Sequence, residues 1–227
     1  MLMKKAAILI DGGWFTKVLR SELSVPVPGG QPKRPIISAA VVRKNALLAL
    51  DLSEEEPFRI FYYDAFPYDR KATNPVDGKT FDFGCSPTHA YATKLFDELG
   101  QMNLVALRRG KLKPRGWTLT DAYVRRAIAA TPGTPRTAPP ILSADDVFFA
   151  LEQKGVDMRI GIDVATLAIK RQVDRIVLLS GDTDMVPAMK LARREGVQVV
   201  VVAVGGTRIS PELIEDADIL RAIQPVL

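Results

Sequence analysis

Two separate apolar runs each lead into aspartate, and this pattern constrains the fold of the chain more than any other feature. Residues 6–10 run directly into Asp11, and residues 175–179 run into the segment 180–184. Apolar runs of about five residues are typical of strands buried on both faces, as in parallel sheets. Ligands of open α/β sheets bind at the carboxyl ends of such strands. The sequence therefore predicts an α/β fold with a carboxylate-lined site at one edge of a mainly parallel sheet.

Asp11, Asp182 and Asp184 would repel one another if they met at this edge. At an effective dielectric near 20, two charges about 4 Å apart cost roughly 4 kcal/mol. Either some of these carboxyls are protonated or a cation lies between them. The single Cys85 and the single His89 exclude a Cys/His zinc site. Oxygen ligands favour Mg²⁺ or Mn²⁺, and we expect one of these ions.

Each of these aspartates also has a structural interpretation. Asp11 could cap the helix that follows it, because Asp is a favoured N-cap residue. Asp182 or Asp184 could cap the helix expected over residues 184–195, where carboxylates gain from the helix dipole. One cap accounts for only one of these two aspartates, which favours a site. The hydroxyls of Ser180 and Thr183 could hold a water bound to the metal.

The hydrophobic pattern predicts one domain over residues 1–227, with strands alternating with helices. Residues 197–204 could form a central strand or an edge strand. Proline-rich and polar stretches predict flexible excursions near 24–36, 67–86 and 131–140. The expected strands are 6–10, 58–63, 175–179 and 197–204, with a strand pair at 104–113 and 116–119. The expected helices are 14–22, 38–51, 88–100, 157–172 and 184–195.

Composition is that of an ordinary globular protein, with 47% hydrophobic and 25% charged residues among 227. An uninterrupted apolar stretch near 20 residues is absent from the sequence, so we expect no membrane span. The apolar run after Lys5 is too short for the core of a signal peptide. A single cysteine excludes an internal disulfide framework and favours a reducing cytoplasm as the location.

The net charge of +5 weakly indicates a polyanionic partner. Basic side chains gather in the run 108–115, in the pair 125–126 and in the pair 193–194, and solvated surface charge is the alternative for each cluster. Trp117, Tyr62, Phe66 and Tyr68 could stack unpaired bases or could pack within the protein. The expected nucleic-acid contacts are Arg108, Arg109, Lys111, Lys113, Arg193 and Arg194.

The segment 154–169 places two further carboxylates on a helix that is apolar nearly all round. Asp157 stands at its start and could be a cap, whereas Asp163 lies inside the helix and needs a partner. At 100° per residue the two lie about 120° apart, so they need not address the same metal. Asp163 could instead orient Lys170, Arg171 or a water. We expect Lys154 to contact a phosphate.

Four segments together resemble the LabA-like NYN family, which belongs to the PIN-like ribonuclease fold. They are Ile-Asp-Gly at 10–12, Tyr-Tyr-Asp at 62–64, Lys-Gly-Val-Asp at 154–157 with Asp163 following, and Ser-Gly-Asp-Thr-Asp at 180–184 with Pro187. The resemblance implies a Rossmann-like, three-layer α/β/α arrangement and an acidic Mg²⁺ or Mn²⁺ site that hydrolyses RNA. By this resemblance the catalytic and metal-binding positions are Asp11, Asp157, Asp182 and Asp184, with Asp163 as a supporting acid.

The chain departs from the family pattern at two positions. Many relatives have Asn where this chain has Trp14, and often Phe where it has Met185. Trp14 could remove a polar substrate contact, supply a base-stacking surface or be a core aromatic. Neither departure removes a carboxylate.

The sequence thus predicts a metal-dependent ribonuclease, with single-stranded RNA as the expected partner. The alternative is a binding module of the same fold that captures RNA or a protein with little or no turnover. A phosphotransferase with Asp11 as nucleophile is disfavoured, because the second acid usual two residues later is Gly13 here. Homo-oligomerisation is left open.

Overall fold

The computed structural model describes residues 2–129 and 140–227, and this part of the chain divides into two compact units. Unit 1 consists of Met1–Ala65, Lys94–Gly110 and Gly155–Leu227. Unit 2 consists of Phe66–Thr93 and Lys111–Lys154. The single domain that the sequence predicts over residues 1–227 stays a prediction.

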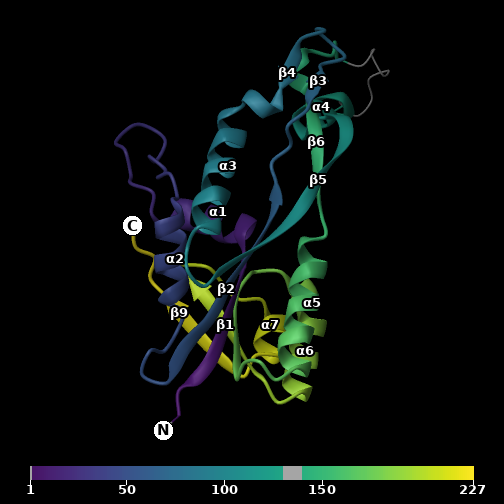
Figure 1. The fold of residues 1–227 in the computed structure, drawn as a ribbon. Coiled ribbons are helices and arrows are strands. Elements are labelled where there is room, and N and C mark those ends of the chain that lie inside the picture. Colours follow the sequence, from purple (N-terminus) through teal and green to yellow (C-terminus); the bar gives the residue numbers. More distant parts are fainter. Residues whose placement is uncertain (1, 130–139) are drawn as a thin grey trace. The chain divides into compact units, whose positions relative to one another are not determined.

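Five strands of unit 1 form a parallel sheet, of which β1, β2 and β9 are labelled in Figure 1. Within the seven-stranded order β6-β5-β2-β1-β7-β8-β9, each neighbouring pair from β2 to β9 is parallel. This confirms the predicted α/β fold with a mainly parallel sheet, and it makes residues 197–204 an interior strand. The bounds are β1 Lys4–Asp11, β2 Glu55–Phe66, β7 Arg175–Leu179, β8 Gln198–Val204 and β9 Ile219–Ile223.

The central strands are buried on both faces, as their apolar sequences predict. Every residue of β7 is buried, and so are residues 6–10 of β1. Alternate residues of a strand point to opposite faces. Ala7 and Leu9 face a core shared with α5 (Val156–Ile169), α6 (Val186–Arg194) and α7 (Pro211–Glu215). Figure 1 shows α5 and α6 side by side on this face.

The opposite face of the unit 1 sheet is covered by a second helical layer. Ile8 and Ile10 point to this face, and α1 (Gly12–Glu22) and α2 (Ala39–Leu47) also bury apolar side chains. The ring of Tyr62 lies 6.3 Å from that of Phe96, near the end of α3 (Pro87–Gly100). Unit 1 is therefore a three-layer α/β/α structure, as the sequence predicts.

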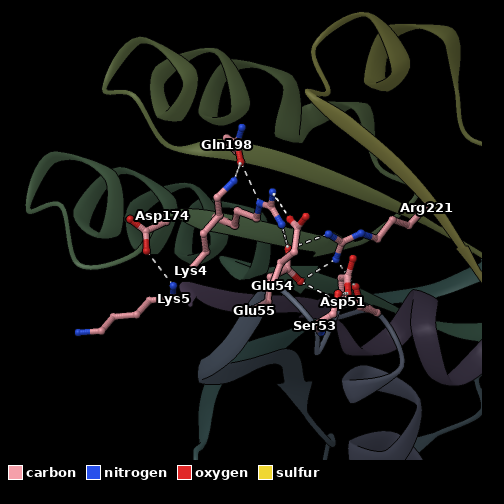
Figure 2. A network of polar contacts seen from close by, with 11 residues as sticks. Lys4, Lys5, Asp51, Ser53, Glu54, Glu55, Asp174, Gln198 and Arg221 are labelled. Atoms are coloured by element: carbon pink, nitrogen blue, oxygen red, sulfur yellow. Dashed lines mark hydrogen bonds and ion pairs between the residues drawn. The ribbon is translucent and has the colours of Figure 1, made fainter. Parts of the chain in front are cut away.

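A polar network, shown in Figure 2, joins the amino ends of β1, β2, β7 and β8 to the middle of β9. Arg175, the first residue of β7, donates to Glu55 of β2 at 2.5 Å and to Gln198 of β8 at 2.8 Å. Arg221 of β9 donates to both carboxylate oxygens of Glu55, at 2.7 and 2.8 Å. Lys4 of β1 donates to Gln198 at 3.2 Å. One network therefore reaches every parallel strand of unit 1.

Glu55 is the centre of this network because it carries its charge while fully buried. Its side chain is 0% exposed and that of Arg175 is 5% exposed. Burial raises the pKa of Glu55, but hydrogen bonds from Arg221 and Arg175 outweigh burial and hold that pKa below its ordinary value. The carboxylate is thus ionised at neutral pH, and its charge depends on both guanidinium groups.

Unit 2 combines two antiparallel strand pairs with a cluster of aromatic rings. The second part of β5 (Val105–Leu119) pairs with β6 (Val147–Lys154), and β3 (Lys71–Thr73) pairs with β4 (Thr80–Asp82). An ion pair between Arg126 and Asp146 joins α4 (Asp121–Ile128) to the short helix η2 (Ala144–Asp146). The clustered rings have neighbouring centroids 4.7 to 5.8 Å apart and belong to Tyr68, Phe81, Phe83, Trp117 and Phe149.

Several elements of unit 2 differ from the sequence prediction. The strand pair expected at 104–113 and 116–119 is one continuous strand, β5, with an irregularity between Pro114 and Gly116. A proline followed closely by a glycine resembles a hairpin turn, but here it marks a bulge, and the true partner is β6. The expected loop before α3 contains β3, β4 and the short helix η1 (Phe83–Cys85).

The predicted excursions have different outcomes. Residues 24–36 are mostly exposed and contain an isolated bridge between Val25 and Lys33. Of the excursion near 131–140, residues 131–139 lie outside the described part of the chain. Among the described residues, the helices are all too short or too polar to cross a membrane. Cys85 is a free, exposed thiol, and the cytoplasmic location stays a prediction.

Glu55→Gln should destabilise the protein strongly. The amide keeps the shape of the side chain but leaves two guanidinium charges without their buried partner, which costs about 3 to 5 kcal/mol. Urea unfolding at pH 7 measures this loss. Glu54→Gln is the matched control, because Glu54 meets Arg175 at 3.2 Å with a side chain that is 43% exposed, and its loss should stay below about 1 kcal/mol. Equal losses in the two variants would contradict a dominant role for Glu55.

Candidate metal centre

Three of the predicted acids converge at the carboxyl edge of the unit 1 sheet. Asp157, Asp182 and Asp184 each offer a carboxylate oxygen, and these oxygens all lie within 4.8 Å of one another. Asp182 is half-buried, whereas Asp157 and Asp184 are exposed. Two of them come from the loop after β7 and one from the start of α5. The structure therefore brings Asp157 to two acids that lie 25 and 27 positions later in the sequence.

Local hydrogen bonds fix the two acids that follow β7. Asp182 caps the short helix η3 (Thr183–Met185), since its Oδ1 accepts the N–H of Asp184 at 2.9 Å. The hydroxyl of Ser180 accepts the N–H of Asp182 at 3.1 Å. Asp182 is thus both the predicted cap and a member of the acidic cluster. Thr183 lies in η3 and is exposed.

Asp157 reaches the cluster from the first turn of α5. The helix begins after Gly155, which is its N-cap and has no side chain to fill that role. Asp157 therefore does not serve as the N-cap that the sequence allowed. Burial raises the pKa of Asp157, and the charges of Asp182 and Asp184 raise it further.

Asp11 combines a capping role with electrostatic contact to the cluster. It is the N-cap of α1, and its Oδ1 accepts the N–H of Trp14 at 3.1 Å. Burial raises the pKa of Asp11, the hydrogen bond from Trp14 lowers it, and the charges of Asp157 and Asp182 raise it, with a net upward shift. The capping interpretation is confirmed, whereas a role for Asp11 at a metal stays a prediction.

The donor set fits a hard divalent cation. Every clustered ligand atom is a carboxylate oxygen, the type that Mg²⁺ and Mn²⁺ prefer. Burial is the largest cause of the raised pKa values of Asp11 and Asp157, and repulsion from neighbouring carboxylates raises them further. A cation would remove this repulsion. The cluster can therefore hold a metal ion, with Asp157, Asp182 and Asp184 as the residues placed to bind it.

Asp64 is a fifth acid at this edge, and it is not among the predicted site residues. It follows Tyr63, which lies opposite Asp11 in the parallel pairing of β1 with β2. Burial raises the pKa of Asp64 to about 6, and the charge of Asp11 contributes. The available signal was its place directly after an apolar strand, the same signal that identified Asp11.

Asp163 lies away from the cluster and has partners of its own. Its Oδ2 accepts the hydroxyl of Tyr63 at 2.8 Å and the Nε of Arg108 at 2.7 Å. The sequence had suggested Lys170, Arg171 or a water as its partner. Burial and the Asp163 charge both raise the pKa of Tyr63. The Arg108 guanidinium also lies 5.1 Å from the ring centroid of Phe61. Arg108, predicted to contact nucleic acid, thus interacts with Asp163 and Phe61 within unit 1.

The other basic residues predicted on β5 divide between the units. The guanidinium of Arg109 lies 5.7 Å from the ring centroid of Phe96 in unit 1. Lys111 and Lys113 are exposed in unit 2, where they line a groove of about 320 Å³ together with residues 66–70. This groove brings Arg70 and Tyr68 beside the two lysines.

Arg193 and Arg194 end α6, at the amino edge of the sheet and away from the acids. They line a cavity of about 650 Å³ with Gln198, the first residue of β8. Arg193 donates to Asp218 at 3.0 Å, so its charge is partly balanced. Lys154, the last residue of β6, forms an ion pair with Glu152 in unit 2.

The aromatic candidates occupy different environments. Tyr62 is 1% exposed, and a Cβ on Gly12 would lie 2.4 Å from its ring, so only glycine fits beside it. Tyr62 is therefore a core side chain. Phe66 is 36% exposed, and Tyr68 and Trp117 belong to the aromatic cluster of unit 2.

Mn²⁺ or Mg²⁺ should raise the thermal unfolding midpoint, because a ligand at 100 times its Kd stabilises the folded state by about 2.7 kcal/mol. Asp182→Asn keeps an oxygen that can cap η3 but removes one charge. This variant should be at least as stable as the parent in EDTA and should show a smaller metal-induced shift in calorimetry. Asp121→Asn, an exposed change on α4, should leave the shift unchanged. Equal shifts in both variants would exclude Asp182 as a ligand.

Asp64→Asn should change the pH dependence of stability in EDTA. The folded-state pKa of about 6 lies above the ordinary 3.8. Ionisation of Asp64 therefore destabilises the parent progressively as the pH rises between these two values, and the full loss of stability is reached above the folded-state pKa. The variant should gain about 2 to 3 kcal/mol over the parent between pH 4 and pH 7. Urea unfolding across this range measures the gain. Asp77→Asn is the control of opposite sign, and this variant should be less stable than the parent at neutral pH. The reason is that the backbone N–H of Lys79 stabilises the ionised carboxylate and lowers the pKa of Asp77.

Comparisons with known proteins are consistent with this geometry. The NYN domain family matches residues 87–224, which is more than half of the chain and includes all three clustered acids but not Asp11. An uncharacterised protein of Sinorhizobium fredii, y4oD, is 39% identical over 69 residues. That match covers 30% of this chain, and the chain spans about a third (32%) of that relative's length.

A crystal structure of VPA0982, a protein of unknown function from Vibrio parahaemolyticus, is also similar. It has 19% sequence identity and a TM-score of 0.46, and the match covers 97% of this chain and 93% of that one. The LabA-like subtype stays a prediction. The match over residues 87–224 shows that the chain belongs to the NYN domain family, a PIN-like ribonuclease family.

Proposed function

We propose that the chain is a metal-dependent ribonuclease that hydrolyses phosphodiester bonds of single-stranded RNA. The observation that carries the proposal is the convergence of Asp157, Asp182 and Asp184 at the carboxyl edge of a parallel sheet. Membership of a PIN-like ribonuclease family supports a nuclease at this coarse level. Hydrolysis of RNA and dependence on Mg²⁺ or Mn²⁺ are the finer parts of the proposal.

The carboxylates would act by holding the cation and placing a phosphate beside it. Asp157, Asp182 and Asp184 would bind the ion, and Asp11 would add negative charge from the neighbouring strand β1. A divalent cation bound there lowers the pKa of water and stabilises the anionic oxygens of a phosphodiester. The hydrogen bonds that Asp11 and Asp182 accept from backbone N–H groups keep both carboxylates in place.

A candidate surface for the RNA backbone lies in unit 2. Lys111, Lys113 and Arg70 line one groove with Tyr68, which combines cations for phosphates with a ring for a base. This combination is typical of proteins that bind single strands. By contrast, Arg108 and Arg193 are engaged with Asp163 and Asp218, so we assign them no part in RNA binding.

Cleavage of end-labelled single-stranded RNA tests the proposal. Purified protein should cleave this RNA in the presence of Mn²⁺ or Mg²⁺, and EDTA should abolish cleavage. Asp182→Asn should lower the rate by more than about 10- to 100-fold, the loss typical of groups that only support a metal ligand. Asp121→Asn is the matched control, because it removes the same charge from an exposed position on α4. Its cleavage rate should equal that of the parent.

The alternative function, an RNA- or protein-binding module, gives a different outcome. Folded protein that binds RNA but leaves it intact with both metals would favour the module and reject the hydrolase. Cleavage that survives Asp182→Asn would reject the acidic cluster as its source and indicate a contaminating nuclease.

A further inference from the structure

Trp14 links the two loops that carry the acids. Its backbone N–H donates to Asp11 Oδ1 at 3.1 Å, which fixes the first turn of α1 against the end of β1. Its indole lies against Gly181 in the loop after β7, where a Cβ on Gly181 would be 2.6 Å from Nε1. Asp182 is the next residue. Trp14 therefore contacts Asp11 through its backbone N–H and the loop of Asp182 through its indole.

The indole is only partly covered. Trp14 is half-buried, whereas Phe15 beside it is completely buried. Gly13 and Gly181 are both exposed and have no side chains that could cover the ring. A core tryptophan would be enclosed by side chains, but this one borders two exposed glycines at a charged edge. Trp14 is thus partly exposed, and its indole contacts the residue that precedes Asp182.

We propose that Trp14 is the surface on which the nucleobase beside the scissile phosphate stacks, an inference that rests on the proposed function. A phosphate bound to a cation at the acidic cluster would lie beside the loop of Asp182, whose neighbour Gly181 the indole contacts. Every base has a π-face that can stack on an aromatic side chain, so the contact tolerates any sequence. A base that stacks on protein must leave its own helix, and Trp14 therefore selects unpaired RNA.

Tryptophan fluorescence gives a readout that does not depend on cleavage. Trp117→Phe leaves Trp14 as the only tryptophan, because the chain has two. With Ca²⁺ in place of Mn²⁺, a single-stranded RNA should quench its emission in a saturable manner. The same RNA with one abasic nucleotide at the stacking position keeps its phosphates and should quench much less. A duplex of equal length should also quench much less.

Substitution tests the contact in the otherwise unaltered chain. Trp14→Ala should weaken RNA binding, measured by anisotropy, about 10-fold or more, and Trp14→Phe should weaken it less. The abasic RNA should lose affinity for the parent but not for Trp14→Ala. Thermal midpoints and Mn²⁺-induced shifts should be kept in Trp14→Phe, which separates stacking from a purely structural role. Phe148→Ala, which removes an exposed ring from β6, is the control for loss of aromatic surface.

The outcomes separate this inference from the proposed function. RNA that binds without changing Trp14 emission, and with equal affinity for Trp14→Ala, would overturn the stacking role alone. Quenching and base-dependent binding without cleavage in Mn²⁺ would support the stacking role and reject the hydrolase. An absence of RNA binding by the folded parent would overturn both.

Discussion

The buried hydrogen bonds of Glu55 with Arg175 and Arg221 hold β2, β7 and β9 in one pairing register. The position of the acidic residues depends on that register. A shift of one residue would move every side chain of a strand to the opposite face of the sheet. In the register observed, Ile10 lies opposite Leu179 and Asp11 lies opposite Tyr63. The acids that follow these strands therefore emerge at one edge. Attraction between charges at the amino edge positions the charges that repel one another at the carboxyl edge.

The acids at the carboxyl edge lower the stability of the folded chain when they are ionised. Burial and neighbouring charges raise the pKa values of Asp11, Asp64 and Asp157, so each is harder to ionise in the folded state than in an unfolded chain. Natural proteins keep such local conflicts mainly at functional sites. By contrast, Glu55 is equally charged and more deeply buried, yet two guanidinium groups compensate it. The difference between these two edges is the main physical argument for a site.

The sequence predicts the parts of this site that follow apolar strands, because such strands are identified by composition alone. This signal predicts Asp11 and Asp182, and the nearly continuous apolar sequence of residues 154–169 predicts α5. The same logic applied to β2 would have found Asp64, but that strand is more polar at its start. The pairing of Asp163 with Arg108 could not be predicted, since it depends on the course of β5. That course was hidden by Pro114 and Gly116, which resemble a turn.

The close approach of Trp14 to Gly181 also limits how this chain can vary. A side chain at position 181 would occupy the space of the indole, so an alanine there requires a smaller residue at position 14. The two positions are 167 apart in sequence but share one volume. In an alignment of close relatives they should therefore change together, and a tryptophan at the first position should be accompanied by glycine at the second. Such covariation would follow from the volume that the two positions share between the acidic loops.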